Sequence, residues 1–209
     1  MLTVSNTSVM NFENAMRGAR NPLSSWARSD SYTDEAGAFV FGEADLSLAR
    51  RLCRAGSDHR KFIRQIFVSA DICAPLYWWK EFDTYKVGTV ANSTSTMHRI
   101  HAAPITAADF SAERLLPECV PAFERYVAVI EDLRLRFVET KDKALWDSII
   151  QLLPSSYNQL RTVTMNYENL AGMYRARRGH QLAEWHTLCA WIETLPYAAD
   201  LITFSPEQE

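Results

Sequence analysis

The sequence has few of the residues that interrupt a chain or cross-link it. Among 209 residues there are only seven Gly, eight Pro and four Cys. This scarcity of Gly and Pro excludes a collagen-like or low-complexity chain, and a composition of 47% hydrophobic and 22% charged residues is typical of a globular protein. A chain of this length buries roughly 70% of its unfolded surface. We therefore expect a hydrophobic core and one domain over residues 1–209.

Metal-ligating and disulfide patterns are also absent. Cys53, Cys73, Cys119 and Cys189 are scattered, without CxxC or a Cys/His cluster at zinc spacing. None of the five His has HxxxH or HExxH spacing. A chain of this size does not need disulfides, so we expect reduced, mostly buried thiols and no metal site.

Neither positive nor negative charge is in large excess, because the net charge is only −3. Sequence-independent binding to duplex DNA needs a basic surplus, so no nucleic acid polymer is expected as a partner, although a local basic pocket for a small phosphorylated ligand is compatible. Residues 1–20 lack an apolar run long enough for a signal peptide or a membrane span. We expect a cytoplasmic protein with no membrane partner.

The periodicity of the chain predicts an α+β fold. Residues 1–44 are interpreted as a loop-rich N-terminal entry with one short helix at 13–20. Alternating or β-branched residues predict strands at 62–72 and 157–165. Spacings of three and four predict helices at 45–55, after Pro75, over 111–153 up to Leu153-Pro154, at 166–178 and at 181–195.

Two clusters are candidates for a ligand site. The segment Gly88–Thr96 is rich in Thr, Ser and Asn, which suits phosphate oxygens but equally a surface turn with local hydrogen bonds. Arg175, Arg177 and Arg178 end a predicted helix, where cations complement the helix dipole. Arg177 lies on a different face from the other two and could instead reach a ligand as a planar fork. The chain shows no GxxxxGK[ST], GxGxxG or GxSxG motif.

The order of these segments resembles the central signature of the flavin-dependent thymidylate synthases. The chain runs APLYWWKEFDTYKVGTVANSTSTMHR from Ala74 to Arg99, directly after a predicted strand. Ala74-Pro75 and the apolar pair after it match the start of the signature. Thr89 stands where the signature has its first Ser, and Asn92 and Ser95 match the Asn and Ser of NExS. Leu153-Pro154, Asn166, Leu170, Arg177, His180 and Glu184 follow in the family's order, so the resemblance covers about 45–184.

The departures fall on ligand-facing positions of the family. Its Arg-His-Arg falls on Thr84-Tyr85-Lys86, and the Glu of NExS is replaced by Ser93. The Arg of its later strand falls on Leu160, with Arg161 adjacent. Because Lys and Tyr cannot make the bidentate contacts of Arg, the substrate or the reaction of this chain can differ from that of the family.

The resemblance implies a mostly antiparallel central sheet flanked by helices, and a homotetramer that holds FAD at sites between subunits. It implies transfer of a one-carbon unit from methylenetetrahydrofolate to C5 of dUMP, a pyrimidine deoxynucleotide, with NADPH as reductant. No protein nucleophile is required, because the flavin carries the redox chemistry.

The resemblance also assigns roles to residues. Arg177 is the expected catalytic residue, which binds the pyrimidine and stabilises negative charge on its ring. The remaining expected nucleotide-binding residues are Lys86, Thr89, Asn92, Ser93, Ser95 and Arg161. The expected flavin-binding residues are Tyr85, Lys86, Asn166 and His180, with Trp78, Trp79 or Tyr85 able to stack on a flavin or a base.

Three hypotheses follow. The first is flavin-dependent one-carbon transfer to C5 of dUMP. The second keeps the fold with another reaction, such as use of dCMP or hydroxymethyl transfer. The third is a non-catalytic nucleotide-binding or structural protein that retains the scaffold.

Overall fold

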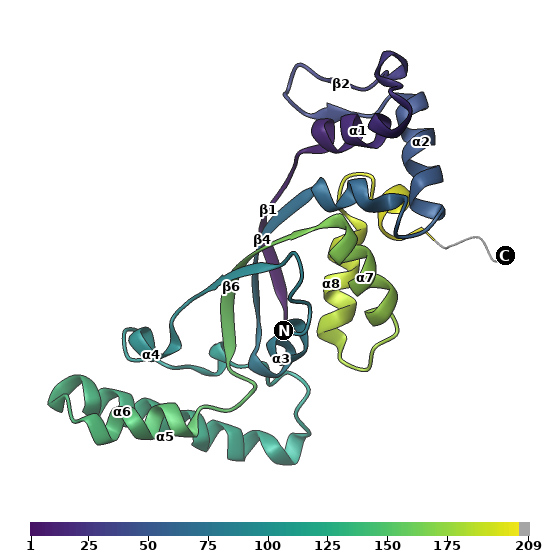
Figure 1. Ribbon diagram of the computed structural model, residues 1–209. Helices are drawn as coiled ribbons and strands as arrows, with labels where there is room; N and C mark the ends of the chain where they lie inside the picture. The colour runs from purple at the N-terminus through teal and green to yellow at the C-terminus, as the bar shows by residue number, and fades with distance from the viewer. Residues whose placement is uncertain (205–209) are drawn as a thin grey trace. The chain divides into compact units, whose positions relative to one another are not determined.

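The computed structural model describes residues 1–204, which form an α+β fold with an antiparallel sheet flanked by helices (Figure 1). The main sheet has four strands in the order β1-β4-β6-β5. Its strands are β1 (Thr3–Met10), β4 (Phe67–Pro75), β5 (Val90–Ser93) and β6 (Asn158–Asn166). A second, two-stranded sheet pairs β2 (Tyr32–Thr33) with β3 (Phe39–Val40). The predicted fold class is confirmed.

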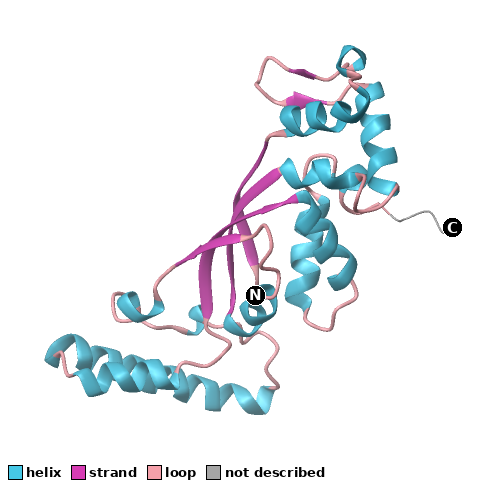
Figure 2. Ribbon diagram, viewed as in Figure 1, coloured by secondary structure: helices cyan, strands magenta, loops and turns pink. Residues whose placement is uncertain are grey.

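The helices, cyan in Figure 2, occur in both units. They are α1 (Phe12–Arg20), α2 (Glu43–Arg54), α3 (Leu76–Phe82), α4 (Thr96–Arg99), α5 (Val120–Thr140), α6 (Lys143–Leu152), α7 (Tyr167–Arg177), α8 (Ala183–Glu193) and α9 (Ala198–Leu201). Within the described residues, no helix combines the length and the apolar character that a bilayer crossing requires.

Strands β4 and β6 form the centre of the sheet and run antiparallel. Ser69 shares a hydroxyl–hydroxyl bond of 2.7 Å with Thr164, and two positions further along β4 Asp71 accepts a hydrogen bond of 2.5 Å from Thr162. The partner moves backward on β6 as the position moves forward on β4, which is the antiparallel register.

The chain divides into two compact units. Unit 1 comprises Met1–Thr3, Asp71–Thr84 and Ala91–Thr162, and unit 2 comprises Val4–Ala70, Tyr85–Val90 and the chain from Val163 onward. In unit 1, α5 and α6 lie side by side (Figure 1) and cover a core of Ile100, Ile105, Phe110, Ile130 and Ile149. In unit 2, α7 packs against α8.

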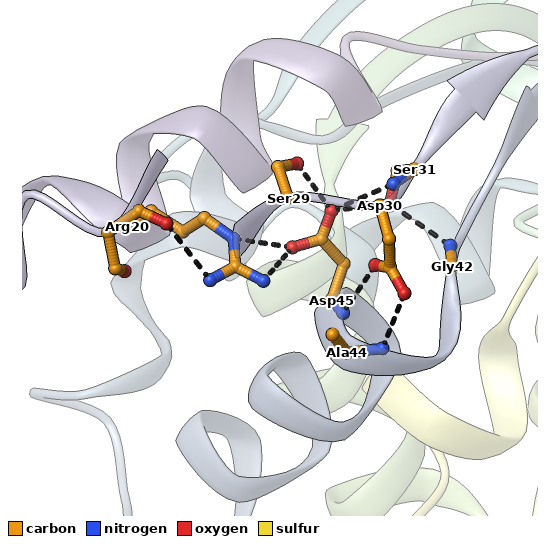
Figure 3. Close-up of polar contacts among 8 residues, drawn as sticks. Arg20, Ser29, Asp30, Ser31, Gly42, Ala44 and Asp45 are labelled. Carbon is orange, nitrogen blue, oxygen red and sulfur yellow. Dashed lines mark hydrogen bonds and ion pairs between the residues drawn. The ribbon is translucent and has the colours of Figure 1, made fainter. Parts of the chain in front are cut away.

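A buried ion pair holds the connection between α1 and α2 in unit 2 (Figure 3). Asp45 is fully buried, and its carboxylate accepts hydrogen bonds from Arg20, Ser29 and Ser31. Asp30 accepts hydrogen bonds from the backbone N–H groups of Ala44 and Asp45, at 2.8 and 3.0 Å, and so satisfies the free end of α2. Both carboxylates therefore fix a connection that has little regular structure.

Most predicted elements are confirmed, and the corrections have local causes. The short helix predicted at 13–20 is confirmed as α1, but residues 1–44 are not otherwise mainly loop, because they also contain β1. Strand β1 is mostly exposed and lies at a sheet edge, so it lacks the apolar alternation by which a strand is predicted. The strand predicted at 62–72 begins instead with a 3₁₀ segment at Arg60–Gln65. The predicted loop at Gly88–Thr96 contains the short strand β5, whose four residues are exposed.

Candidate functional site

The predicted site residues fall into two groups, one in each unit. Unit 2 contains Tyr85, Lys86, Thr89, Asn166, Arg177 and His180, and unit 1 contains Asn92, Ser93, Ser95 and Arg161.

The unit 2 group is organised by α7. Asn166 caps this helix, because its side-chain oxygen accepts the backbone N–H of Asn169, and the side-chain oxygen of Asn169 accepts the backbone N–H of Asn166. The amide of Asn169 also donates to the carbonyl of Val87 at 2.7 Å. Gly88, at φ +72°, lies so near that an added Cβ would be 2.8 Å from Nδ2 of Asn166. The helix cap thus holds the segment Tyr85–Val90 in place.

Arg177 lies at the other end of α7, against two aromatic rings. Its Nε donates to the hydroxyl of Tyr85 at 2.9 Å. Its guanidinium carbon is 4.6 Å from the ring centroid of Trp185 and 5.6 Å from that of Tyr85. The two rings meet edge to face at 5.9 Å. Cation–π contact on a buried indole orients the guanidinium plane.

The three arginines of this region have different surroundings. Arg175 is exposed at its surface, and partial desolvation, followed by the charge of Arg60, lowers its pKa, while Glu168 opposes that shift. Arg175 is therefore close to the ion pair in which Arg60 donates to Glu168 at 2.8 and 2.9 Å. Arg178 is exposed. Of the three, Arg177 contacts Tyr85 and Trp185, as its separate helix face predicted.

The remaining unit 2 candidates differ in what they offer. Nδ1 of His180 accepts the backbone N–H of Leu182 at 3.2 Å, so in the neutral ring Nε2 carries the proton. The side-chain oxygen of Thr89 is buried and has no hydrogen-bond partner among the described residues. Lys86 is exposed. Asn166 is buried and already acts as the helix cap.

In unit 1, Arg161 contacts three neighbouring side chains. Its Nη1 donates to Asp83 at 2.7 Å and its Nε to Gln159 at 3.0 Å. Its guanidinium carbon lies 4.2 Å from the ring centroid of Trp79. Trp78 and Trp79 are buried in the core, so of the three rings proposed for stacking only Tyr85 is partly exposed.

The polar loop of unit 1 is tied to β6. Gln159 donates to the carbonyl of Thr94 at 3.0 Å, and the N–H of Thr94 donates to the carbonyl of Leu160 at 2.9 Å. Ser95 caps α4 by accepting the N–H of His98 at 3.1 Å. Asn92 and Ser93 are exposed on β5. The hydroxyl of Ser95 thus serves the local turn, as one of the two sequence interpretations proposed.

Leu160 and Arg161 are not interchangeable in this geometry. Successive side chains of a strand point to opposite faces of the sheet. Arg161 is on the face of Trp79 and Asp83, and the side chain of Leu160 points to the opposite face.

Two residues of the site were missed by sequence reasoning. Trp185 carries no motif signal, and only its ring contact with Arg177 reveals it. Asn169 could have been found, because Asn166 and Asn169 have the spacing of a capping box. Around Trp185, unit 2 thus gathers the guanidinium of Arg177, the phenol of Tyr85 and the imidazole of His180. This set can bind the carbonyl edge of a planar heterocycle and stabilise negative charge on it.

No protein-family model matches the chain, and no curated protein matches it by sequence. In its fold the chain is similar to the flavin-dependent thymidylate synthases, as the sequence resemblance predicted.

The solved structures of that fold match nearly the whole chain. One is the flavin-dependent thymidylate synthase ThyX of Helicobacter pylori, complexed with FAD and dUMP. It has a TM-score of 0.70 and 17% identity, over 96% of this chain and 97% of that one. Another is the UMP/dUMP methylase PolB of Streptomyces cacaoi, bound with 5-Br dUMP. It has a TM-score of 0.64 and 14% identity, over 96% of this chain and 91% of that one.

Proposed function

We propose that the chain is a flavin-dependent enzyme that transfers a one-carbon unit to C5 of a pyrimidine deoxynucleotide. The observation that carries the proposal is the fold, which matches structures of two enzymes that bind or methylate dUMP, one of them complexed with FAD, over at least nine-tenths of each chain. Arg177 supports it, because its guanidinium is oriented at the position that the family signature gives to nucleotide recognition.

Arg177 would act on the pyrimidine ring. A guanidinium donates to ring carbonyl oxygens and stabilises the negative charge that develops when C5 becomes nucleophilic. Its preorganisation by Tyr85 and Trp185 means that little reorientation accompanies the reaction. Ser95, Asn92 and the segment around them are proposed to meet the nucleotide phosphate, with Lys86 as a further cation.

The cysteine environments are consistent with a route that uses no thiolate. Burial raises the pKa of Cys53 to about 12 and that of Cys189 to about 11, and it also raises the pKa of Cys73. Because the thiolate is the reactive form, these three groups are poor nucleophiles near neutral pH.

The residues present fit a flavin. The buried Thr89 hydroxyl has no partner in the described chain, and a buried hydroxyl left unsatisfied costs about 1–3 kcal/mol, which favours a polar ligand beside it. His180 and Lys86 would hold FAD by hydrogen bonds and the Tyr85 ring by stacking, and Asn166, the cap of α7, is the fourth proposed flavin contact. When bound, FAD supplies hydride transfer.

The purified protein tests this proposal directly. It should absorb in the flavin bands, or take up FAD, and it should release tritium from C5-labelled dUMP when supplied with methylenetetrahydrofolate and NADPH. A colourless protein that takes up no FAD would contradict the proposal. Arg177→Ala should abolish dUMP binding with an unchanged circular dichroism spectrum, whereas Arg178→Ala, at the exposed neighbouring position, should bind dUMP normally.

A second candidate keeps the fold and changes the substrate or the group transferred. It is favoured by Leu160, Thr84 and Lys86, which stand where the family signature has arginines. Release of tritium from labelled dCMP but not from dUMP would select it. Nucleotide binding without reduction of FAD by NADPH would instead indicate a non-catalytic binding protein.

The finer parts of the proposal are methylenetetrahydrofolate and NADPH as co-substrates, a homotetramer with sites at subunit interfaces, and a cytoplasmic location. Sedimentation of the FAD-loaded protein tests the tetramer, and cell fractionation tests the location. We also propose that both units behave as one domain, since β1, β4 and β6 each contribute residues to both. A single unfolding transition, identical by tryptophan fluorescence and circular dichroism, would support that.

A further inference from the structure

We propose that the hydroxyl of Tyr85 is a positioning group that sets the orientation of the Arg177 guanidinium for the pyrimidine base. This inference rests on the proposed function and adds to it a residue that acts through Arg177 rather than on the nucleotide alone. It also gives a role to the residue that stands where the family signature has His.

The contacts of Arg177 restrict two different motions. The ring of Trp185, 4.6 Å from the guanidinium carbon, limits the tilt of the guanidinium plane. Stacking alone still allows the group to rotate within that plane. The hydrogen bond of 2.9 Å from Nε to the hydroxyl of Tyr85 removes this rotation. The two aromatic residues therefore have distinct roles, one setting the plane and the other the rotation.

The hydrogen bond also determines which edge of the guanidinium meets a ligand. A guanidinium has five N–H donors in one plane. With the Nε–H donated to Tyr85, a base must be bound through the Nη groups. The carbonyl groups of a pyrimidine ring accept hydrogen bonds in the ring plane, so this orientation determines which bases fit.

Tyr85 is itself held firmly. Two positions further along the chain, the carbonyl of Val87 accepts the hydrogen bond of 2.7 Å from Asn169 in the first turn of α7. Gly88 packs against the capping pair without space for a side chain. The start of α7 thus fixes the backbone beside Tyr85, and Tyr85 fixes the arginine at the end of the same helix. Arginine has a long, flexible side chain, so ordering it before the ligand arrives lowers the entropic cost of binding.

A purely structural role for Tyr85 makes a different prediction. If the ring only fills space, Tyr85→Phe keeps the ring and changes nothing. If the hydroxyl orients Arg177, the same change weakens recognition of the base and leaves recognition of the phosphate intact.

The test is a double-mutant cycle on the full-length, FAD-loaded protein, with calorimetric titration of dUMP and of deoxyribose 5-phosphate. Tyr85→Phe should weaken dUMP binding about tenfold, the size expected for one lost hydrogen bond to a charged group, and leave deoxyribose 5-phosphate binding unchanged. In the Arg177→Lys background, which lacks the planar donor, Tyr85→Phe should change dUMP affinity less than about twofold. The matched control is Tyr174→Phe, which removes the bond of 2.6 Å from Tyr174 to Glu193 in the same unit and should bind dUMP normally.

Three results would overturn the inference. Wild-type affinity for dUMP in Tyr85→Phe shows that the hydroxyl has no role. An equal loss in the Arg177→Lys background shows that Tyr85 acts independently of Arg177. A wild-type protein that binds no pyrimidine nucleotide overturns the proposed function and the inference together, whereas either of the first two results leaves the proposed function standing.

Discussion

Asp45 and Arg20 lie 25 positions apart in the chain and form an ion pair in the interior of unit 2, with side chains 0% and 5% exposed. Both charges are compensated there, because Ser29 and Ser31 complete the hydrogen bonding of the carboxylate. Removing one partner leaves the other charge buried and alone, which is far more costly than the loss of a surface pair.

Asp45→Asn should therefore lower the free energy of unfolding by about 3–5 kcal/mol. The measurement is urea denaturation at pH 7. Asp132→Asn is the matched control, since the Arg136–Asp132 pair is more than half exposed and should contribute less than about 1 kcal/mol. Equal changes in the free energy of unfolding for the two substitutions would mean that the buried pair stabilises the fold no more than an exposed pair does.

The same pair predicts a dependence of stability on pH. Burial alone would raise the pKa of Asp45, but hydrogen bonds from Ser31, Ser29 and Arg20 outweigh it and hold the pKa below its ordinary value of 3.8. Such a group stabilises the folded state above that ordinary value, and this contribution is lost as the pH falls through the lower folded value. The stability difference between wild type and Asp45→Asn should be constant from pH 5 to 7 and shrink below about pH 4. A difference that is unchanged at pH 3 would refute this.

Gly88 gives a second stability prediction. Ala at this position has a strained positive φ and a Cβ 2.8 Å from Nδ2 of Asn166, so Gly88→Ala should lower the free energy of unfolding by about 1–3 kcal/mol and weaken dUMP binding. Gly172→Ala, in the interior of α7 with no atom within 4 Å of the new Cβ, should instead raise stability by about 0.5–1 kcal/mol. Denaturation of the two variants should shift the midpoint in opposite directions.

The four cysteine thiols should react with a disulfide reagent at different rates. Cys119 is exposed, Cys53 and Cys189 are buried, and the pKa of Cys53, Cys73 and Cys189 is raised by burial. With a chromogenic disulfide at pH 8, one thiol should react rapidly in the native protein and four in denaturant. Cys119→Ser should abolish the rapid phase. Two or more rapid thiols in the native wild type would show that the buried cysteines are accessible.

The sequence predicts the elements that have apolar periodicity or a cap. Helix α7 begins at the predicted Asn166, and β6 and α8 fall at their predicted places, because periodicity and capping are local properties. Strand β1 was missed because it is polar and mostly exposed. Its place is set by pairing with β4, far along the chain, and such pairing leaves no pattern in the residues of β1 themselves.

The candidate site was predictable in part for a similar reason. The separate orientation of Arg177 follows from helical spacing and was foreseen. Its neighbour Trp185 is on another helix. The contacts of Arg161 with Asp83 and Trp79 join residues some eighty positions apart. Contacts of this kind depend on the tertiary fold, which a pattern in one segment does not contain.

The proximity of Arg177 to Trp185 should make the fluorescence of Trp185 sensitive to ligand binding. Indole emission responds to a neighbouring charge, and the guanidinium carbon lies 4.6 Å from the Trp185 ring. A charged or polar ligand bound to the guanidinium changes the electric field at that indole. Occupancy of the proposed nucleotide site should therefore be measurable by ultraviolet emission, without a label and without turnover, and Trp185→Phe identifies the part of the signal that arises at this position.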